Sequence, residues 1–411
     1  MTRESDLLAA IKATPADDAP RAIYGDLLAE RGDPRGEFIQ LQLRGSQDQA
    51  ASRAAYALQS EHAAAWAKEL GGEGLTLYWE RGFPKSIISG DIAKVVAARA
   101  LIRTQPILGL SLLSLAGDLP AMAELAQVPE LAAIEELSLK GNAPSWQNIP
   151  PPARALAALA GSPYLHPRKL AIEENLLDDA GAEAFATAGW LAGVDHLVMI
   201  HHPGNVAPVL AAIRAARQIY IARCSLGERG ARALAALPVV ELQLDHCGVH
   251  EAGARILFGS LARVEQLRIV GDTLHDALEA FALATPTTLS LEDCSLTTAG
   301  TAAFVHRGSS SLVAIELANN SIGAGFAATV GPFPSLQRLD LRDNDLTGAD
   351  IEALATARLP ALASIGLSDN VKSGDSHVVT WTNGPDEQGA TVVDDYITAG
   401  QLQPRFRATV F

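Results

Sequence analysis

The chain has 411 residues, 48% of them apolar and 19% charged, and its formal net charge is −15 at pH 7. The apolar content is typical of a folded chain, and the acidic balance argues against sequence-independent nucleic-acid binding, which needs clustered Lys and Arg. The same balance disfavours anionic membrane surfaces, so we expect neither a nucleic acid nor a membrane as a partner.

Residues 1–75 are predicted to form a small helical domain. The first apolar stripe contains Leu7, Leu8 and Ile11. Asp18 followed by Pro20 is typical of a second helix start, because Asp caps helices and Pro is tolerated in the first turn. The segment from Gly32 to Pro34 is expected to end that helix, and a third helix is expected from Glu37 onward.

The segment from Ala16 to Gln42 contains D-A-P-R and E-R-G-D-P-R-G-E-F-I-Q-L-Q, and it resembles the bacterial repeat-companion domain. The later segments His62-x-x-x-Trp66 and Trp79-Glu80-Arg81-Gly82-Phe83 extend the likeness, which covers roughly residues 4–83. That module stands before leucine-rich-like repeats in planctomycete and myxobacterial proteins. The resemblance therefore implies a bacterial origin and an association with repeats, and it implies no activity.

Two roles stay open for this helical domain. We favour a cap on the first repeat, because an exposed apolar end of a repeat stack invites aggregation. Alternatively, the Asp- and Arg-rich turn from Gly32 to Gly36 docks a partner. We interpret the clustered acidic and basic residues as helix caps, turn formers and ion pairs, not as a catalytic constellation.

A second pattern recurs from residue 76 to residue 370. Two apolar residues with one residue between them are followed, three positions after the second, by Asn, Cys or another polar residue, and we call that last position the slot. The spacing between slots ranges from 22 residues (His202 to Cys224) to 33 residues (Asn142 to Asn175). The slots, which define about eleven repeats, are Asp118, Asn142, Asn175, His202, Cys224, Cys247, Asp272, Cys294, Asn320, Asn344 and Asn370.

This pattern resembles the leucine-rich-repeat signature L-x-x-L-x-L-x-x-N/C-x-L. Four units place a glycine four residues after the apolar residue that follows the slot, and alanine-rich, helix-favouring stretches come next. These features resemble the ribonuclease-inhibitor-like subclass. The predicted fold is therefore α/β: a leucine-rich-repeat solenoid (horseshoe) with a parallel concave sheet and convex helices, preceded by the small helical domain. A proline-rich insertion at residues 149–152 is expected in an exposed loop.

The slot has a physical role in such a fold. The chain turns inward after each strand and leaves buried backbone groups that need hydrogen-bond partners. An Asn amide donates and accepts, and a Cys thiol is a small donor that tolerates burial, so slot side chains are predicted to tie neighbouring turns together. This structural ladder comprises Asn142, Asn175, His202, Cys224, Cys247, Cys294, Asn320, Asn344 and Asn370.

No Cys-x-x-Cys pair or Cys/His spacing suits a metal, so we expect no metal and no cofactor. Neighbouring strand residues point to opposite faces, which disfavours a joint site of His201, His202 and His246. Three unpaired cysteines in buried slots, an N-terminus without the apolar core of a secretion signal, and no long apolar run together favour the cytoplasm.

After the last repeat, residues 371–411 are predicted to form a cap or a tail. Strands are expected at residues 377–382 and 391–393, with Asn383-Gly384 as a turn. We favour a cap over the last repeat, and a partner-binding tail is the alternative.

The predicted function is non-enzymatic recognition of a protein partner on the concave face, where alternate strand residues are exposed. Aromatic and arginine side chains are enriched in the hot spots of protein interfaces. The sequence contains no G-x-S-x-G, no H-E-x-x-H and no phosphate-binding glycine loop, so no known catalytic motif is recognised. The alternatives are a regulatory module whose companion domain docks the partner, an enzyme with an unrecognised site, and a solvated face without a ligand. The predicted partner-binding residues are His196, Ile200, His201, Tyr220, Arg223, Glu241, Asp245, His246 and Arg268.

Overall fold

A computed structural model describes residues 3–45, 48–113, 115, 119–141, 153–174, 176–261, 263–282, 284–328, 330–347, 349–350, 353–354, 357, 359–367, 370, 379–382 and 407–410. The chain forms two compact units, residues 1–194 and 195–411. The division falls inside the predicted repeat array, and the domain limits placed at residues 75 and 370 stay predictions.

The first unit begins with four helices: α1 (Arg3–Ala13), α2 (Ala19–Ala29), α3 (Pro34–Leu43) and α4 (Gln49–Glu69). Helix α3 begins three residues before the expected Glu37. The Asp33 carboxylate accepts a hydrogen bond from the Arg35 N–H (2.8 Å), and Pro34 occupies the first turn, so the segment expected to end one helix also starts the next.

An antiparallel hairpin follows the helices, formed by β1 (Thr76–Glu80) and β2 (Phe83–Ser89). Its two-residue turn has positive φ at Arg81 (50°) and Gly82 (83°), the geometry that joins antiparallel strands with their natural twist. The Trp79 ring lies 5.6 Å from that of Trp66, and Phe83 packs into the core of Ile11, Tyr24, Leu28 and Ile39. The hairpin is therefore part of the helical core.

Strand β2 also begins the parallel part of the first unit, which continues with β3 (Gly109–Leu112), β4 (Glu136–Lys140) and β5 (Lys169–Glu173). Apolar residues align across it in one buried column of Ile87, Leu110, Leu137 and Leu170. The connections contain α5 (Ile92–Ala97), α6 (Arg99–Thr104), α7 (Leu119–Leu125), η1 (Pro129–Ala133), α8 (Ala153–Ala160), α9 (Asp179–Phe185) and η3 (Gly189–Gly193).

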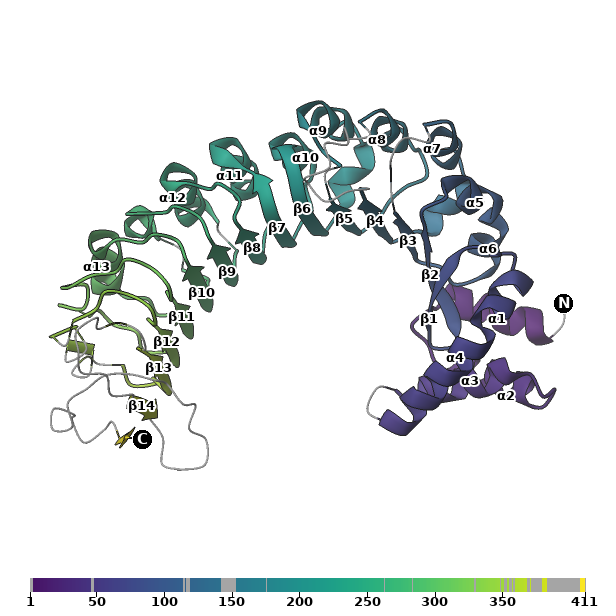
Figure 1. Ribbon diagram of the computed structural model, residues 1–411, viewed down its shortest axis with the longest axis horizontal. Coiled ribbons are helices and arrows are strands. Elements are labelled where there is room, and N and C mark those ends of the chain that lie inside the picture. The colour runs from purple at the N-terminus through teal and green to yellow at the C-terminus, as the bar shows by residue number, and fades with distance from the viewer. Residues whose placement is uncertain are drawn as a thin grey trace. The chain divides into compact units, whose positions relative to one another are not determined.

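The second unit contains a parallel sheet of β6 (His196–Asn205), β7 (Gln218–Ser225), β8 (Glu241–Asp245), β9 (Gln266–Val270), β10 (Thr288–Glu292), β11 (Ala314–Glu316), β12 (Arg338–Asp340) and β13 (Ser364–Gly366). Antiparallel β14 (Val379–Thr382) and β15 (Arg407–Val410) complete it. Its helices are α10 (Ala207–Ala212), α11 (Gly227–Ala235), α12 (Glu251–Ser260), η4 (Ala277–Ala280) and α13 (Thr298–Arg307). Within each unit the helices lie on one side of the repeat strands (Figure 1).

Burial alternates along each strand as a one-sided sheet requires. In β8, Leu242 and Leu244 are buried, whereas Glu241, Gln243 and Asp245 are only partly covered. We call the face that carries these last three residues, away from the helices, the open face. Between the sheet and the helices, neighbouring rings of Phe258, Phe281, Phe304 and Phe333 follow one another at centroid distances of 5.7, 5.2 and 6.0 Å.

The four glycines noted in the repeats are all buried in the first turn of a helix, Gly181 in α9, Gly230 in α11, Gly253 in α12 and Gly300 in α13. A Cβ on Gly300 would lie 2.7 Å from the Cα of Asp276, so this helix approaches the preceding repeat closely. The α/β leucine-rich-repeat fold with a parallel sheet and helices is thus confirmed. Helices are not uniform, because η4 is a 3-10 helix and the described residues between β11 and β12 form turns. The ribonuclease-inhibitor-like subclass stays a prediction.

None of the helices in the described ranges combines the length and the apolar character needed to cross a bilayer.

The strand expected at residues 377–382 corresponds to β14. The strand expected at residues 391–393, the insertion at residues 149–152 and the slots Asn142 and Asn175 lie outside the described residues. Asp118 also lies outside them, but its assignment as a slot is wrong, because β3 pairs the buried Leu110 and Leu112 with Leu137 and Leu139 and this register places the slot at the buried Leu115.

Candidate functional site

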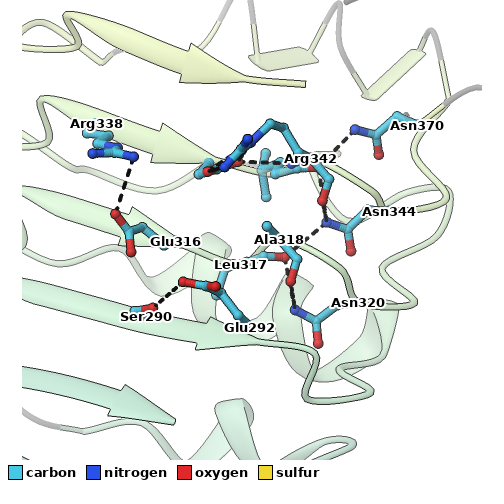
Figure 2. Close-up of polar contacts among 12 residues, drawn as sticks. Ser290, Glu292, Glu316, Leu317, Ala318, Asn320, Arg338, Arg342, Asn344 and Asn370 are labelled. Atoms are coloured by element: carbon cyan, nitrogen blue, oxygen red, sulfur yellow. Dashed lines mark hydrogen bonds and ion pairs between the residues drawn. The ribbon is translucent and has the colours of Figure 1, made fainter. Parts of the chain in front are cut away.

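The open face of the second unit ends, in every repeat, at a slot residue that faces the interior. Asn344 is 3% exposed, and its amide donates to the carbonyl oxygens of Leu317, Leu341 and Arg342 (3.0, 3.0 and 3.1 Å). Its own carbonyl accepts from the N–H of Ile322 (3.3 Å). Each amide thereby links its repeat to the preceding one, and Figure 2 shows Asn320, Asn344 and Asn370 repeating this arrangement.

The three cysteines occupy equivalent positions with a single donor. Each thiol points to a carbonyl of its own strand and to one of the preceding strand: Cys247 Sγ lies 3.4 Å from the Asp245 oxygen and 3.1 Å from the Ile221 oxygen. Cys224 and Cys294 make the same pair of contacts. Burial raises the pKa of the Cys224 thiol to about 11 and those of Cys247 and Cys294 to about 12.

Thiol labelling of the native protein is expected to be slow at all three cysteines. The thiolate is the reactive form, and these raised pKa values together with burial should slow reaction with N-ethylmaleimide at pH 7.5 by roughly a hundred-fold or more relative to the urea-unfolded chain. Mass spectrometry of timed samples measures this. Native labelling at the rate of an exposed cysteine would show that the thiols are accessible.

Asp272 places a carboxylate in a slot, with 5% exposure. It accepts hydrogen bonds from the backbone N–H groups of Cys247, Gly248 and Val249 (3.3, 2.6 and 3.3 Å). Burial raises the pKa of this carboxyl and outweighs the lowering by those three donors. An ionised Asp272 is therefore a cost to the fold that an amide would avoid.

Asp272→Asn is expected to raise the free energy of unfolding at pH 7 by about 1 kcal/mol, because Asn keeps the acceptor without the buried charge. The pKa of Asp272 is higher in the folded chain than in the unfolded one. The stability contributed by protonated Asp272 is therefore fully present below about pH 4 and is lost as the pH rises through the folded pKa. Urea unfolding at pH 4 and pH 7 measures the difference. A gain equal at both pH values, or one reproduced by the exposed Asp293→Asn, would contradict this cause.

In the second unit, wherever the structure describes it, the residue before the slot adopts a left-handed backbone. Positive φ values occur at His201 (59°), Arg223 (52°) and His246 (51°), and further along at Asp293, Asn319 and Asp343. Asn, Asp and His are the non-glycine residues most often found in this conformation. The turn therefore accounts for part of the residue choice in this column, which includes three of the predicted partner-binding residues. Asp369, which the sequence places in the same column, lies outside the described residues.

Polar side chains at the start of the open face form a hydrogen-bonded chain. His196 Nδ1 lies 2.9 Å from Gln218 Oε1, and the Gln218 amide donates to Glu241 Oε2 (3.2 Å). The Gln243 amide donates to the other oxygen of Glu241 (2.7 Å). Toward the other end of the same strands, Arg223 lies 3.1 Å from His201, and the His246 ring contacts Asp245 (2.5 Å). These eight residues thus form one hydrogen-bonded chain and two separate pairs, and each side chain already has a polar contact before any ligand arrives.

Apolar residues lie between this polar chain and the polar pairs near the strand ends. Strand register places Val198 beside Tyr220 and Ile200 beside Ala222. Val198, Ile200 and Tyr220 are each partly exposed on the open face. The first strands of the second unit therefore offer aliphatic and aromatic surface that a partner side chain can cover.

Ion pairs link strands of the open face from β9 to β12. Arg268 makes a two-pronged contact with Glu292 (2.6 and 3.3 Å) and donates to Ser290 (3.0 Å). Glu316 lies 3.9 Å from Arg268 and 3.6 Å from Arg338, so the ion pairs run across four strands. Figure 2 shows Ser290, Glu292, Glu316 and Arg338 on the strands, apart from the Asn ladder.

Arg342 and Asp340 form the last pair of this network. The Arg342 guanidinium donates to both oxygens of Asp340 (2.6–3.0 Å), whose side chain is 9% exposed. Burial alone would raise the pKa of Asp340, but the hydrogen bonds and charge of Arg342, aided by Arg338, outweigh it and lower this pKa. The pair therefore stabilises the fold above the ordinary pKa of Asp and loses this effect as the pH falls through the lowered value.

Among the nine predicted partner-binding residues, all occupy the open face or the turn at its edge. The prediction missed Glu292, Glu316, Arg338, Asp340 and Arg342, which continue the same rows through the strand register. Extending each row of alternate positions to residues 288–342 of the sequence identifies them. Within the described residues, no group of three His, Cys, Asp or Glu side chains is arranged to hold a metal ion.

Comparison with known proteins agrees with the repeat architecture. A family model described as "Leucine Rich repeat" matches residues 334–355. The chain is similar to internalin C2 from Listeria monocytogenes (16% identity over 53% of this chain and 84% of that one, TM-score 0.33). It is also similar to the ectodomain of the Arabidopsis receptor kinase HAESA, solved in complex with a peptide hormone ligand (14% identity, 69% and 42%, TM-score 0.34). At these identities the likeness concerns the fold alone. No curated protein matches the sequence.

The strands, the slot ladder and the family-model match over residues 334–355 together define a leucine-rich-repeat fold.

Proposed function

We propose that this protein is a non-enzymatic recognition module and that the open face of β6–β13, the predicted concave face, binds a segment of a protein partner. One observation carries the proposal: partly exposed Val198, Ile200 and Tyr220 lie beside charged and amide side chains that already hold one another in place. Apolar anchors next to oriented polar groups are the composition that protein interfaces favour.

The ordered side chains favour tight binding. A side chain that is already fixed loses little rotational freedom on association, whereas a mobile one costs about 0.5–1.5 kcal/mol. Glu241 receives two amides and Arg268 holds Glu292 and Ser290, so both enter an interface in fixed geometry. A stable partner needs about 800 Å² on each side, an area that several adjacent repeats supply.

The charges in the second half of the face balance. Arg268, Arg338 and Arg342 are matched by Glu292, Glu316 and Asp340. A partner therefore gains little from net charge there and must instead match the pattern of donors and acceptors. This arrangement favours a defined protein sequence over a generally basic or acidic polymer.

Affinity capture from lysate of the source cells tests the proposal. Wild type should retain a partner that Tyr220→Ala and Arg268→Ala each weaken by about ten-fold or more, as expected for aromatic and arginine hot spots. Arg229→Ala, on the exposed side of α11, is the matched control and should bind like wild type. Equal retention of the partner by all four proteins would show that the open face does not bind it.

The companion-domain alternative needs point variants. Deleting residues 1–75 would remove the core in which Phe83 packs and would expose Trp79, so the truncated chain is not a clean test. Loss of binding only in variants of the helical domain would support that alternative, and turnover of any substrate would support an enzyme. The bacterial origin and cytoplasmic location predicted from the sequence are part of the same proposal.

A further inference from the structure

A pocket of about 200 Å³ lies in the first unit where the segment before α2 meets the β1–β2 hairpin. Its walls are partly apolar, with Phe83, Pro84, Pro106 and Leu108. Three cationic side chains and one carboxylate also line it: Arg21, Arg81, Lys85 and Glu80. The pocket therefore has partly apolar walls, and its charged side chains are positive on balance.

Arg21 is the unusual member of this lining, because its residue is only 4% exposed. Its guanidinium donates to the carbonyl oxygens of Arg81 (3.1 Å) and Pro15 (3.0 Å) and lies 4.9 Å above the centre of the Phe83 ring. Its Nε is buried and makes no hydrogen bond within the described residues. Backbone carbonyls thus fix the orientation of a buried cation whose donors are not all used.

The neighbouring charges do not neutralise Arg21. Arg81 pairs with Asp18 (3.1 Å) and Lys85 pairs with Glu80 (2.6 Å), so both nearby carboxylates already contact another cation. No carboxylate in the described part of the chain forms an ion pair with Arg21. Burial, followed by the charge of Arg81, lowers the pKa of Arg21 to about 10, because the charges of Asp18 and Glu80 offset these two effects only in part.

We propose that this pocket binds a carboxylate group of a peptide ligand, with Arg21, Arg81 and Lys85 as its cationic partners. A single negative charge balances the one cation left without a carboxylate, and a buried charge is far less costly when paired. The apolar walls suit the aliphatic part of an acidic side chain or of a C-terminal residue. Carboxylates also match the planar, two-pronged geometry of guanidinium donors.

Isothermal titration calorimetry on the full chain tests this with three short probes. The first is N-acetyl-Ala-Ala-Leu with a free C-terminal carboxylate, and the second is the same peptide as its C-terminal amide. The third is N-acetyl-Ala-Glu-Ala amide, which carries only a side-chain carboxylate. At least one carboxylate probe should bind about ten-fold more tightly than the neutral amide, and the better of the two identifies the source of the carboxylate.

Two substitutions then locate the site. Lys85→Gln, in the pocket, should weaken the better probe by about three-fold or more while the far-ultraviolet circular dichroism stays unchanged. Lys68→Gln removes the same charge from an exposed position on α4, where Lys68 pairs with Glu73, and should have no effect. Absence of binding at millimolar probe, equal binding of acid and amide, or equal weakening by both substitutions would overturn the assignment.

Discussion

Asn344→Ala is expected to lower the free energy of unfolding by about 3 kcal/mol. The amide of Asn344 serves three buried carbonyl groups and its oxygen serves one N–H. A buried polar group without a hydrogen-bond partner costs about 1–3 kcal/mol, so the loss of all four bonds could lower the free energy of unfolding by several times that amount. The carbonyls of Leu317 and Leu341 also accept from Asn320 and Asn370, which reduces the loss.

Urea unfolding followed by circular dichroism measures this change, and hydrogen exchange shows where it acts. Each repeat is stabilised by the repeats next to it, so a local loss affects the adjacent repeats most. Amides of β11 to β13 should therefore exchange faster than those of β6 and β7. Gln337→Ala, an exposed position in the same repeat, is the control and should stay within about 0.5 kcal/mol of wild type. A loss below about 1 kcal/mol for Asn344→Ala would contradict the importance of the slot bonds.

Gly36→Ala is expected to destabilise the helical part of the first unit by about 2–3 kcal/mol. The added Cβ would lie 2.4 Å from the Ala29 nitrogen and 2.6 Å from the Gly25 oxygen. Both are backbone atoms, so no side chain can move aside and α3 must shift away from α2. Such a shift also disturbs the adjoining core of Tyr24, Ile39 and Phe83.

Thermal unfolding and hydrogen exchange of the α2 and α3 amides measure the effect of Gly36→Ala. Gly189→Ala is a matched control, because a Cβ there meets nothing within 4 Å, and it should change the free energy of unfolding by less than about 0.5 kcal/mol. Equal stability of the two variants would mean that the close approach of α2 and α3 is not what requires glycine at position 36.

The repeat strands were predictable from the sequence because their constraint is periodic. Every repeat must bury two strand residues and turn at a slot, so Leu242, Leu244 and Cys247 carry the same information as Leu289, Leu291 and Cys294. Contacts that are made once have no such repetition. The burial of Arg21 against the hairpin turn depends on residues about 60 positions apart, and no spacing in the sequence indicates it.

The polar surface shows a second limit. Arg268 belonged to the predicted binding set, whereas its partners Glu292 and Glu316 did not, because pairing depends on which rotamers meet across strands. The sequence also did not reveal that His201, Arg223 and His246 sit in a left-handed turn. The left-handed backbone explains part of the residue choice at these positions. Residue type alone is therefore weaker evidence that this column binds a partner.

The open face of β6–β13 should contact a protein partner, and site-specific photo-crosslinking detects such a contact. The photoreactive residue benzoylphenylalanine would replace Gln243 on the open face or, as the comparison, Arg229 on the exposed side of α11. After irradiation in source-cell lysate, we expect a crosslink to one defined protein from position 243 and none from position 229. A crosslink from position 229 alone, or from neither position while the partner is still captured, would contradict it.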